Sequence, residues 1–285
     1  MNRIFLSLIW LMCFSPTLRA QKETDKIACY ACREDNAPHK KKLWDGYEIS
    51  LGPVANPEEA ELKCTAAIYN RAGRVVFRTS GFNVVFDEEL TGEDFDGDGK
   101  PEVVFRTDTG GGNHCCWRYI VFSLLPKPHK LFEIAMEGSV EFEKDKDGKM
   151  VIWQRTSAPG GFSTSMARRP FAEKVSRVRG GKLVDATPEF CGRNDARFER
   201  SDLTPEDLKT LAKAGEQGAE NEDIISALEA RTAQHVFCRE FDEGLKDLNL
   251  WPTGKREIEM KSLADAFTED YPEFAAKLRE ILKNK

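Results

Sequence analysis

Between residues 44 and 200 the chain consists mainly of short apolar runs separated by turn residues. Alternation of apolar and polar positions over about four to eight residues is typical of half-buried β-strands. The strands predicted in this way are RVVFRT at 74–79, NVVF at 83–86, EVVFRT at 102–107, RYIVFSL at 118–124 and KLFEIAM at 130–136. The alternation also continues on both sides of Asp147-Gly148 and of Gly180-Gly181, which predicts two hairpins.

After residue 200 the apolar spacing becomes that of amphipathic helices. Thr204 followed by Pro205 predicts the start of the first helix. A second helix is expected from about residue 222 to 245. The last predicted helix, in the stretch YPEFAAKLREILKNK, has one apolar face made of Phe274, Leu278, Ile281 and Leu282. We expect these helices to pack as a small bundle or over one face of the sheet, rather than to form a groove for a partner.

The two patterns predict an α+β protein with an antiparallel β-rich core and a C-terminal helical region. We expect a sandwich or a strongly twisted open sheet made of propeller-like hairpin units, because about three blades are too few to close a propeller. One possible repeat is VVFRT at 75–79 and 103–107, and another aligns the turn at 143–151 with that at 94–102. The second turn has Val151 where the first has Glu102, so it is either a decayed copy or a coincidence.

The N-terminus MNRIFLSLIWLMCFSPTLRA has the build of a secretory signal peptide, with Arg3, an apolar run at 4–14 and Ala20 before the cut. No other run approaches the ~18 apolar residues of a membrane-spanning helix. We therefore expect a periplasmic or extracellular protein that is not inserted in the membrane after signal removal. The expected segments are the signal peptide at 1–20, an N-terminal arm at 21–43, a β-rich domain with the acidic loop at 44–200, and the helical region at 201–285.

The chain has 42 basic and 48 acidic residues. Removal of Arg3 and Arg19 with the signal leaves 40 basic residues and a net charge of −8. An acidic protein does not attract nucleic acid or anionic lipid by its charge, so we exclude nucleic acid as a partner. Cations fit this balance better.

Seven cysteines remain in the mature chain, and in an exported protein they are expected to form disulfides: Cys29, Cys32, Cys64, Cys115, Cys116, Cys191 and Cys238. Their connectivity cannot be deduced from the sequence, and the odd number leaves one thiol over. A bond from the arm to Cys64 or another partner is one expectation. A bond between Cys191 and Cys238 would clamp the helices to the sheet.

The segment 94–102 places carboxylates at every second position of a tight, glycine-containing loop. Calcium takes six to eight oxygen ligands in flexible geometry, and without a cation clustered carboxylates repel one another. The predicted calcium ligands are Asp94, Asp96, Asp98, Lys100 through its carbonyl, and Glu102. An EF-hand is excluded, because its twelfth loop position would be Phe105.

The pattern D-x-D-G-D-G-x-x-E followed by VVF resembles the calcium loops of integrin-type FG-GAP and VCBS repeats, which connect two strands. The longer segment TGEDFDGDGKPEVVFRTDTGGGNHCCWRYIVFSL resembles a group of uncharacterised exported bacterial proteins. This second resemblance covers about a third of the chain. It implies export and a β-core, and it brings no activity with it.

The stretch TGGGNHCCW, with Asp108 nearby, offers His114, Cys115 and Cys116. These residues suit a nucleophile with its base, a zinc site, a vicinal disulfide, or separate structural disulfides with His114 as a hydrogen-bonded loop residue. We favour the structural disulfides, because residues adjacent in sequence often point to opposite sides of a strand.

No G-x-S-x-G, H-E-x-x-H, P-loop or Rossmann pattern occurs, and the C-x-x-C spacing at 29–32 lacks the helix start and βαβ context that would make it informative. We therefore expect an exported, calcium-binding, non-enzymatic binding or structural module with a protein or glycan ligand. The alternatives are a secreted or periplasmic hydrolase with Asp/Glu catalysts and, third, a thiol-disulfide protein that uses Cys29 and Cys32.

Overall fold

The computed structural model describes residues 27–30, 38–56, 61–108, 110, 117–157, 171–192, 206, 210, 222–251 and 253–284. The signal peptide, Cys32, the segment His114–Cys116 and the helix start at Thr204–Pro205 lie outside these residues. The described strands form three separate antiparallel open sheets, and helices follow them, so the predicted α+β class is confirmed.

The N-terminal and C-terminal sheets are meanders, and in the middle sheet the strand from the start of the chain is added beside the first strand of a four-stranded meander. The N-terminal sheet contains β2 (His39–Lys42), β3 (Glu48–Pro53), β4 (Cys64–Tyr69) and β5 (Val75–Gly81). The middle sheet contains β1 (Ala28–Tyr30), β6 (Asn83–Phe86), β7 (Glu102–Asp108), β8 (Trp117–Ser123) and β9 (His129–Met136). The C-terminal sheet contains β10 (Val140–Lys144), β11 (Met150–Ser157), β12 (Phe171–Arg179) and β13 (Lys182–Asp185). The segment expected to be an arm thus contributes β1 and β2.

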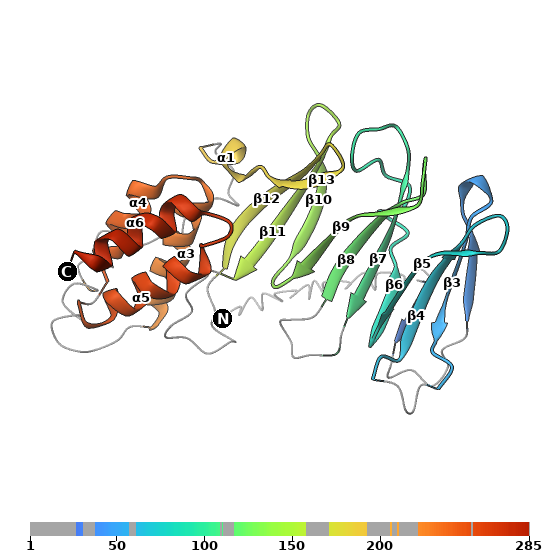
Figure 1. Cartoon of the computed structure of the whole chain (residues 1–285), viewed down its shortest axis with the longest axis horizontal. Helices are drawn as coiled ribbons and strands as arrows, with labels where there is room; N and C mark the ends of the chain where they lie inside the picture. Colours follow the sequence, from blue (N-terminus) through green and yellow to red (C-terminus); the bar gives the residue numbers. More distant parts are fainter. Residues whose placement is uncertain are drawn as a thin grey trace, which may run out of the picture.

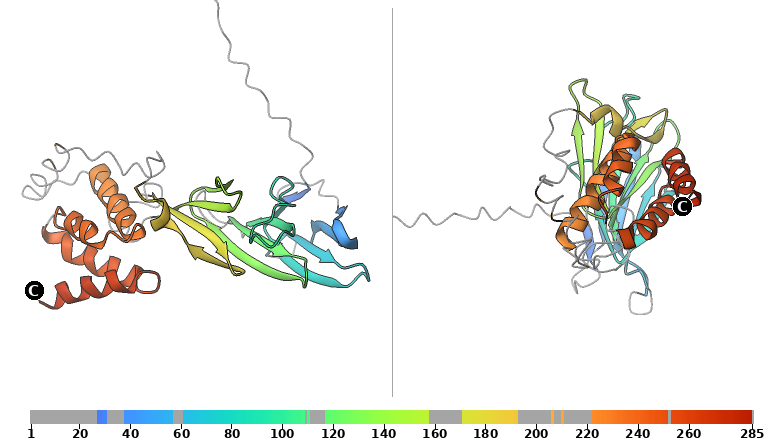
Figure 2. Two further views of the ribbon diagram at one scale, coloured as in Figure 1. Left: turned by 90° about the horizontal axis from the view of Figure 1, so that it is seen from above. Right: turned by 90° about the vertical axis from the view of Figure 1, so that its left-hand side faces the viewer.

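The sheets lie face to face in a row, in chain order, with the helical region beyond the last of them (Figure 1; Figure 2 shows the row from above and from the helical end). The middle sheet is buried on both faces. Val103 and Phe105 of β7 pack toward the N-terminal sheet, and Val104, between them, packs toward the C-terminal sheet. This position explains why β7 has three consecutive apolar residues, Val103–Phe105, and is buried along most of its length, whereas β10, an edge strand, alternates.

The structure supports one of the two possible repeats by position. The turns at 94–102 and 143–151 both connect the first two strands of a meander, β6 to β7 and β10 to β11. The two VVFRT segments are not equivalent, because one lies in β5 at a sheet edge and the other in β7 inside its sheet.

The described α-helices are α1 (Thr187–Phe190), α3 (Glu222–Phe237), α4 (Phe241–Leu248), α5 (Thr253–Ala266) and α6 (Pro272–Lys283), and a 3-10 turn, η1 (Trp44–Gly46), connects β2 to β3. The single helix expected from about residue 222 to 245 is wrong, because the chain breaks after α3 where Arg239 adopts a φ of 60°. None of the described helices is long and apolar enough to cross a membrane. Glu206 and Thr210 are helical, and α6 forms over the predicted stretch with Phe274 and Leu278 buried.

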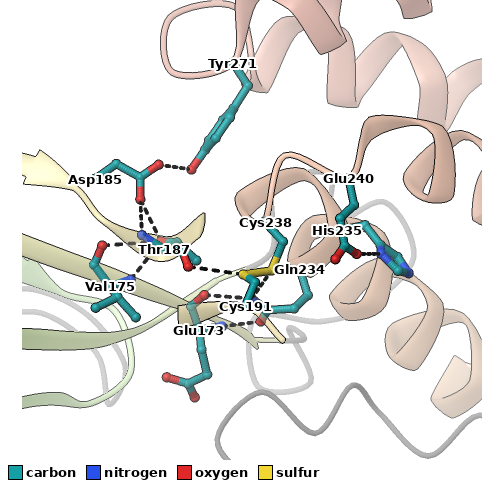
Figure 3. Close-up of a disulfide and its surroundings, with 10 residues drawn as sticks. All are labelled: Glu173, Val175, Asp185, Thr187, Cys191, Gln234, His235, Cys238, Glu240 and Tyr271. Carbon is teal, nitrogen blue, oxygen red and sulfur yellow. Dashed lines mark hydrogen bonds and ion pairs between the residues drawn. A yellow bond between two sulfur atoms is a disulfide. The ribbon is translucent and has the colours of Figure 1, made fainter. Parts of the chain in front are cut away.

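The helical region is fixed to the C-terminal sheet by a disulfide and side-chain hydrogen bonds (Figure 3). Cys191 after α1 is bonded to Cys238 after α3. The side-chain amide of Gln234 accepts from the backbone N–H of Glu173 at 2.8 Å and donates to its carbonyl at 3.0 Å, as a neighbouring strand would. Tyr271 donates to Asp185 at 2.9 Å. Ala172 of β12 packs in the helical core, so the described helices dock on this sheet.

A second disulfide joins Cys29 of β1 to Cys64 of β4 and links the middle and N-terminal sheets. Both expected partners, Cys64 for the arm and Cys238 for Cys191, are confirmed. Two disulfides indicate an oxidising, extracytoplasmic compartment.

Candidate metal centre

The acidic loop between β6 and β7 is anchored to the protein interior by the side chain of Phe95. Phe95 is buried between the middle and C-terminal sheets. Its ring makes T-shaped contacts with the rings of Phe132 and Phe142, at centroid distances of 5.8 and 5.6 Å. The backbone closes the loop above it, since Glu102 N–H donates to the carbonyl of Glu93 at 2.9 Å. With Phe95 directed inward, the carboxylates on either side of it are left at the mouth of the loop.

The structure brings three of the predicted ligands together. Oxygen atoms of Asp94, Asp96 and Glu102 all lie within 4.8 Å of one another. Asp94 and Asp96 are partly exposed, whereas Glu102 is fully buried. This group can bind a metal ion such as calcium.

Backbone N–H groups orient the carboxylates of the loop. Asp94 accepts from Gly97 at 2.7 Å and from Gly99 at 2.9 Å, one bond on each oxygen. Both glycines have positive φ angles, of 78° and 81°, which residues other than glycine rarely adopt. The two glycines therefore let the chain curl so that its amides face Asp94.

Glu102 is the most constrained member of the group. Its Oε2 accepts from the backbone N–H of Phe95 at 2.8 Å, while its Oε1 is buried without a hydrogen-bond partner. The Ser123 hydroxyl lies close enough to Glu102 to lower its pKa slightly, but its hydrogen bond is to the carbonyl of Leu125 at 3.0 Å, which leaves Oε1 unpaired. Burial raises the pKa of Glu102 to about 7, and the negative charges of Asp96 and Asp94 act in the same direction. A cation bound here would relieve both penalties.

The other two predicted ligands lie differently. Asp98 is outside the three-residue group, and it accepts from the backbone N–H of Lys100 at 2.8 Å and from its ammonium at 2.7 Å. This lysine holds the pKa of Asp98 below its usual range. The roles of Asp98 and of the Lys100 carbonyl as ligands stay predictions.

In the equivalent turn of the C-terminal sheet an arginine side chain faces the acidic group. Asp145 aligns with Asp96 and accepts from the N–H groups of Asp147 and Lys149, both at 2.9 Å. Its other oxygen is 2.7 Å from the guanidinium of Arg177 on β12, and both side chains are nearly buried. The N–H of Lys149, together with Arg177, holds the pKa of Asp145 below its usual range. Arg177 supplies at this turn the positive charge that a metal ion would supply at the first.

Replacement of Arg177 by methionine should therefore lower the unfolding temperature by several degrees, equally in calcium and in EDTA, because Asp145 would keep its buried position without a counter-charge. Arg179→Met is the matched control. Arg179 forms an ion pair with Glu189, but its side chain is 56% exposed, so little change is expected. A loss for Arg177→Met that calcium restores would contradict this assignment.

Sequence reasoning did not find Phe95 or Arg177. Phe95 could have been found from the alternation in Asp-Phe-Asp, which places an apolar residue opposite two carboxylates. Nothing local points to Arg177, because it reaches Asp145 from a strand more than 30 residues along the chain. Comparison of the chain with family models, curated proteins and solved structures gave no match.

Proposed function

We propose that this protein is an exported, non-enzymatic binding or structural module in which one calcium ion, held by Asp94, Asp96 and Glu102, stabilises the row of sheets. The buried Oε1 of Glu102 carries the proposal, because it lies beside two other carboxylates and has no hydrogen-bond partner. Such a group is costly unless it is protonated or binds a cation.

The chemistry of the donors favours calcium among the common ions. All three side chains offer carboxylate oxygens and none offers nitrogen or sulfur, which zinc and copper prefer. Backbone carbonyls and water would have to complete the shell of six to eight oxygens that calcium takes. Because Glu102 begins β7 and Phe95 packs between two sheets, an ion here would tie the loop to the interface of the middle and C-terminal sheets.

The function as a module rests on the architecture. The described residues are arranged in series, with disulfides at the first and last interfaces, which gives a rigid body of the kind used for presentation of a surface. Calcium would add a third link, at the interface of the middle and C-terminal sheets, which lies between the two interfaces joined by disulfides.

The test is thermal and chemical unfolding of the disulfide-bonded protein in EDTA and in millimolar calcium. Extracellular calcium sites bind in the ~10⁻⁴–10⁻³ M range, so calcium should stabilise the fold by about 1–2 kcal/mol. Asp96→Asn should abolish this gain, whereas Asp147→Asn, in the equivalent turn closed by Arg177, should retain it. An equal gain in wild type and Asp96→Asn would contradict the site, and so would the absence of any gain.

A further inference from the structure

The outer face of the N-terminal sheet is the one sheet face that no other described sheet or helix covers (Figure 1). Ile49, Leu51 and Ile68 point inward to the middle sheet. The alternate residues therefore point outward, and most of them are small: Ser50, Gly52, Thr65, Ala67 and Ser80. Small side chains at the centre of the face leave it hollow.

Two adjoining hollows, of about 340 and 430 Å³, lie along this face and share Ser50 and Tyr69. We call them together the outer trough. One cross-strand row runs Lys40, Ser50, Ala67, Arg78, so a cation stands on each side of two small residues. Because neighbouring strands are about 4.8 Å apart, the backbones of Lys40 and Arg78 are separated by roughly 14 Å across the sheet.

Several polar side chains of the outer trough are available to a ligand. Within the described residues, Ser50, Tyr69 and Arg78 make no hydrogen bond or ion pair with their side chains. Lys40 has only a long contact of 3.8 Å with Glu48, and both side chains are exposed. The charged residues that line the trough are Lys40, Arg71, Arg78 and Glu48, so it is positive, although the whole chain has a net charge of −6.

We infer that the outer trough binds an acidic polysaccharide, with carboxylates at Arg78 and Lys40 and sugar hydroxyls on the floor. The local positive charge selects an anion. Guanidinium groups pair with carboxylates through two parallel hydrogen bonds, and Tyr69 offers an amphipathic ring to a sugar. An extended peptide would instead pair with a strand edge through its backbone, and this trough lies on a face.

This inference rests on the proposed role as a binding module but not on the calcium site, which lies on the far side of the middle sheet from the trough. The two proposals can therefore fail separately. Binding without calcium stabilisation would remove only the metal centre, and calcium stabilisation without binding would remove only the trough.

The experiment is calorimetric titration of the disulfide-bonded protein with an oligogalacturonate hexasaccharide and with a neutral glucose hexasaccharide, in EDTA and in magnesium-free calcium buffer. We expect binding of the uronic acid probe alone. Arg78→Glu should weaken it about tenfold or more, since a charge-assisted pair is replaced by repulsion. Ser50→Trp should abolish it by filling the floor that both hollows share. Lys182→Glu, an equal charge reversal at an exposed position of β13, should leave it unchanged.

Three results would overturn the inference. Equal weakening by Lys182→Glu would show that binding follows overall charge. Equal binding of the neutral hexasaccharide would remove the role of the cations. Tighter binding of single-stranded DNA or of an acidic peptide at the same residues would assign the trough to another class of partner.

Discussion

Replacement of Cys191 and Cys238 by alanine is expected to lower the free energy of unfolding by roughly 4 kcal/mol, the loop-closure entropy of a link across this separation. The bond spans 47 residues and joins the end of the C-terminal sheet to the turn after α3. Its loss should first destabilise the helical region, which would then be held to the sheet by noncovalent contacts alone, such as those of Gln234, Tyr271 and Lys174.

Native-state hydrogen exchange shows which part of the protein loses stability in the double variant. Amides of α3 and α4 should exchange faster in the double variant, while those of β7 should keep the protection that the global stability allows. The Cys29/Cys64 double variant is the matched control, because its bond spans 35 residues and joins the two other sheets. Equal loss of protection in α3 for both double variants would contradict a local clamp.

The second large effect is expected from pH and centres on Glu259 of α5. This side chain is fully buried, and neither of its oxygens has a hydrogen-bond partner. Burial raises the pKa of Glu259 from 4.5 to about 8, and the negative charge of Glu229 on α3 adds to the effect. The folded state therefore binds a proton that the unfolded state has already released in this range.

The sign of the pH dependence follows from that difference. Between pH 4.5 and 8 the folded protein holds more protons than the unfolded chain, so stability should fall as the pH rises through this window. The full difference amounts to about 3–5 kcal/mol, and most of it is reached by pH 8. Glu259→Gln should remove this slope and make the protein more stable than wild type at neutral pH.

Urea unfolding at a series of pH values between 5 and 8 tests this expectation. The difference between wild type and Glu259→Gln isolates the residue, because other groups with raised pKa values, such as Glu102, contribute equally to both. Glu257→Gln, an exposed position on the same helix, should follow wild type. Parallel curves for wild type and Glu259→Gln would show that Glu259 is not protonated in the folded state.

Local patterns predicted the parts of this fold that local forces determine. The hairpin predicted around Asp147-Gly148 forms, with Lys144 paired to Met150, since turn residues and alternating side chains specify it without distant partners. The grouping of Asp94, Asp96 and Glu102 was predictable for the same reason, because all three lie within nine residues of one loop.

What the sequence did not predict depends on distant contacts. The division of the strands into three sheets depends on which sheet faces are covered. The sequence of β7 would look the same in the core of a sandwich as in the middle sheet of a row. The helix break at Arg239 follows a disulfide-bonded residue, and α5 was missed because the buried Glu259 interrupts its apolar stripe. Strands β1 and β2 come from a polar, basic stretch whose pairing partners lie far along the chain.

The serial order of the sheets also sets the separation between the surfaces at the two ends of the protein. The outer trough and the helical region lie at opposite ends of the row, with the middle and C-terminal sheets between them (Figures 1 and 2). A partner held at one end is therefore kept out of reach of anything held at the other. In this sense the three sheets act as a spacer between the two ends of the protein.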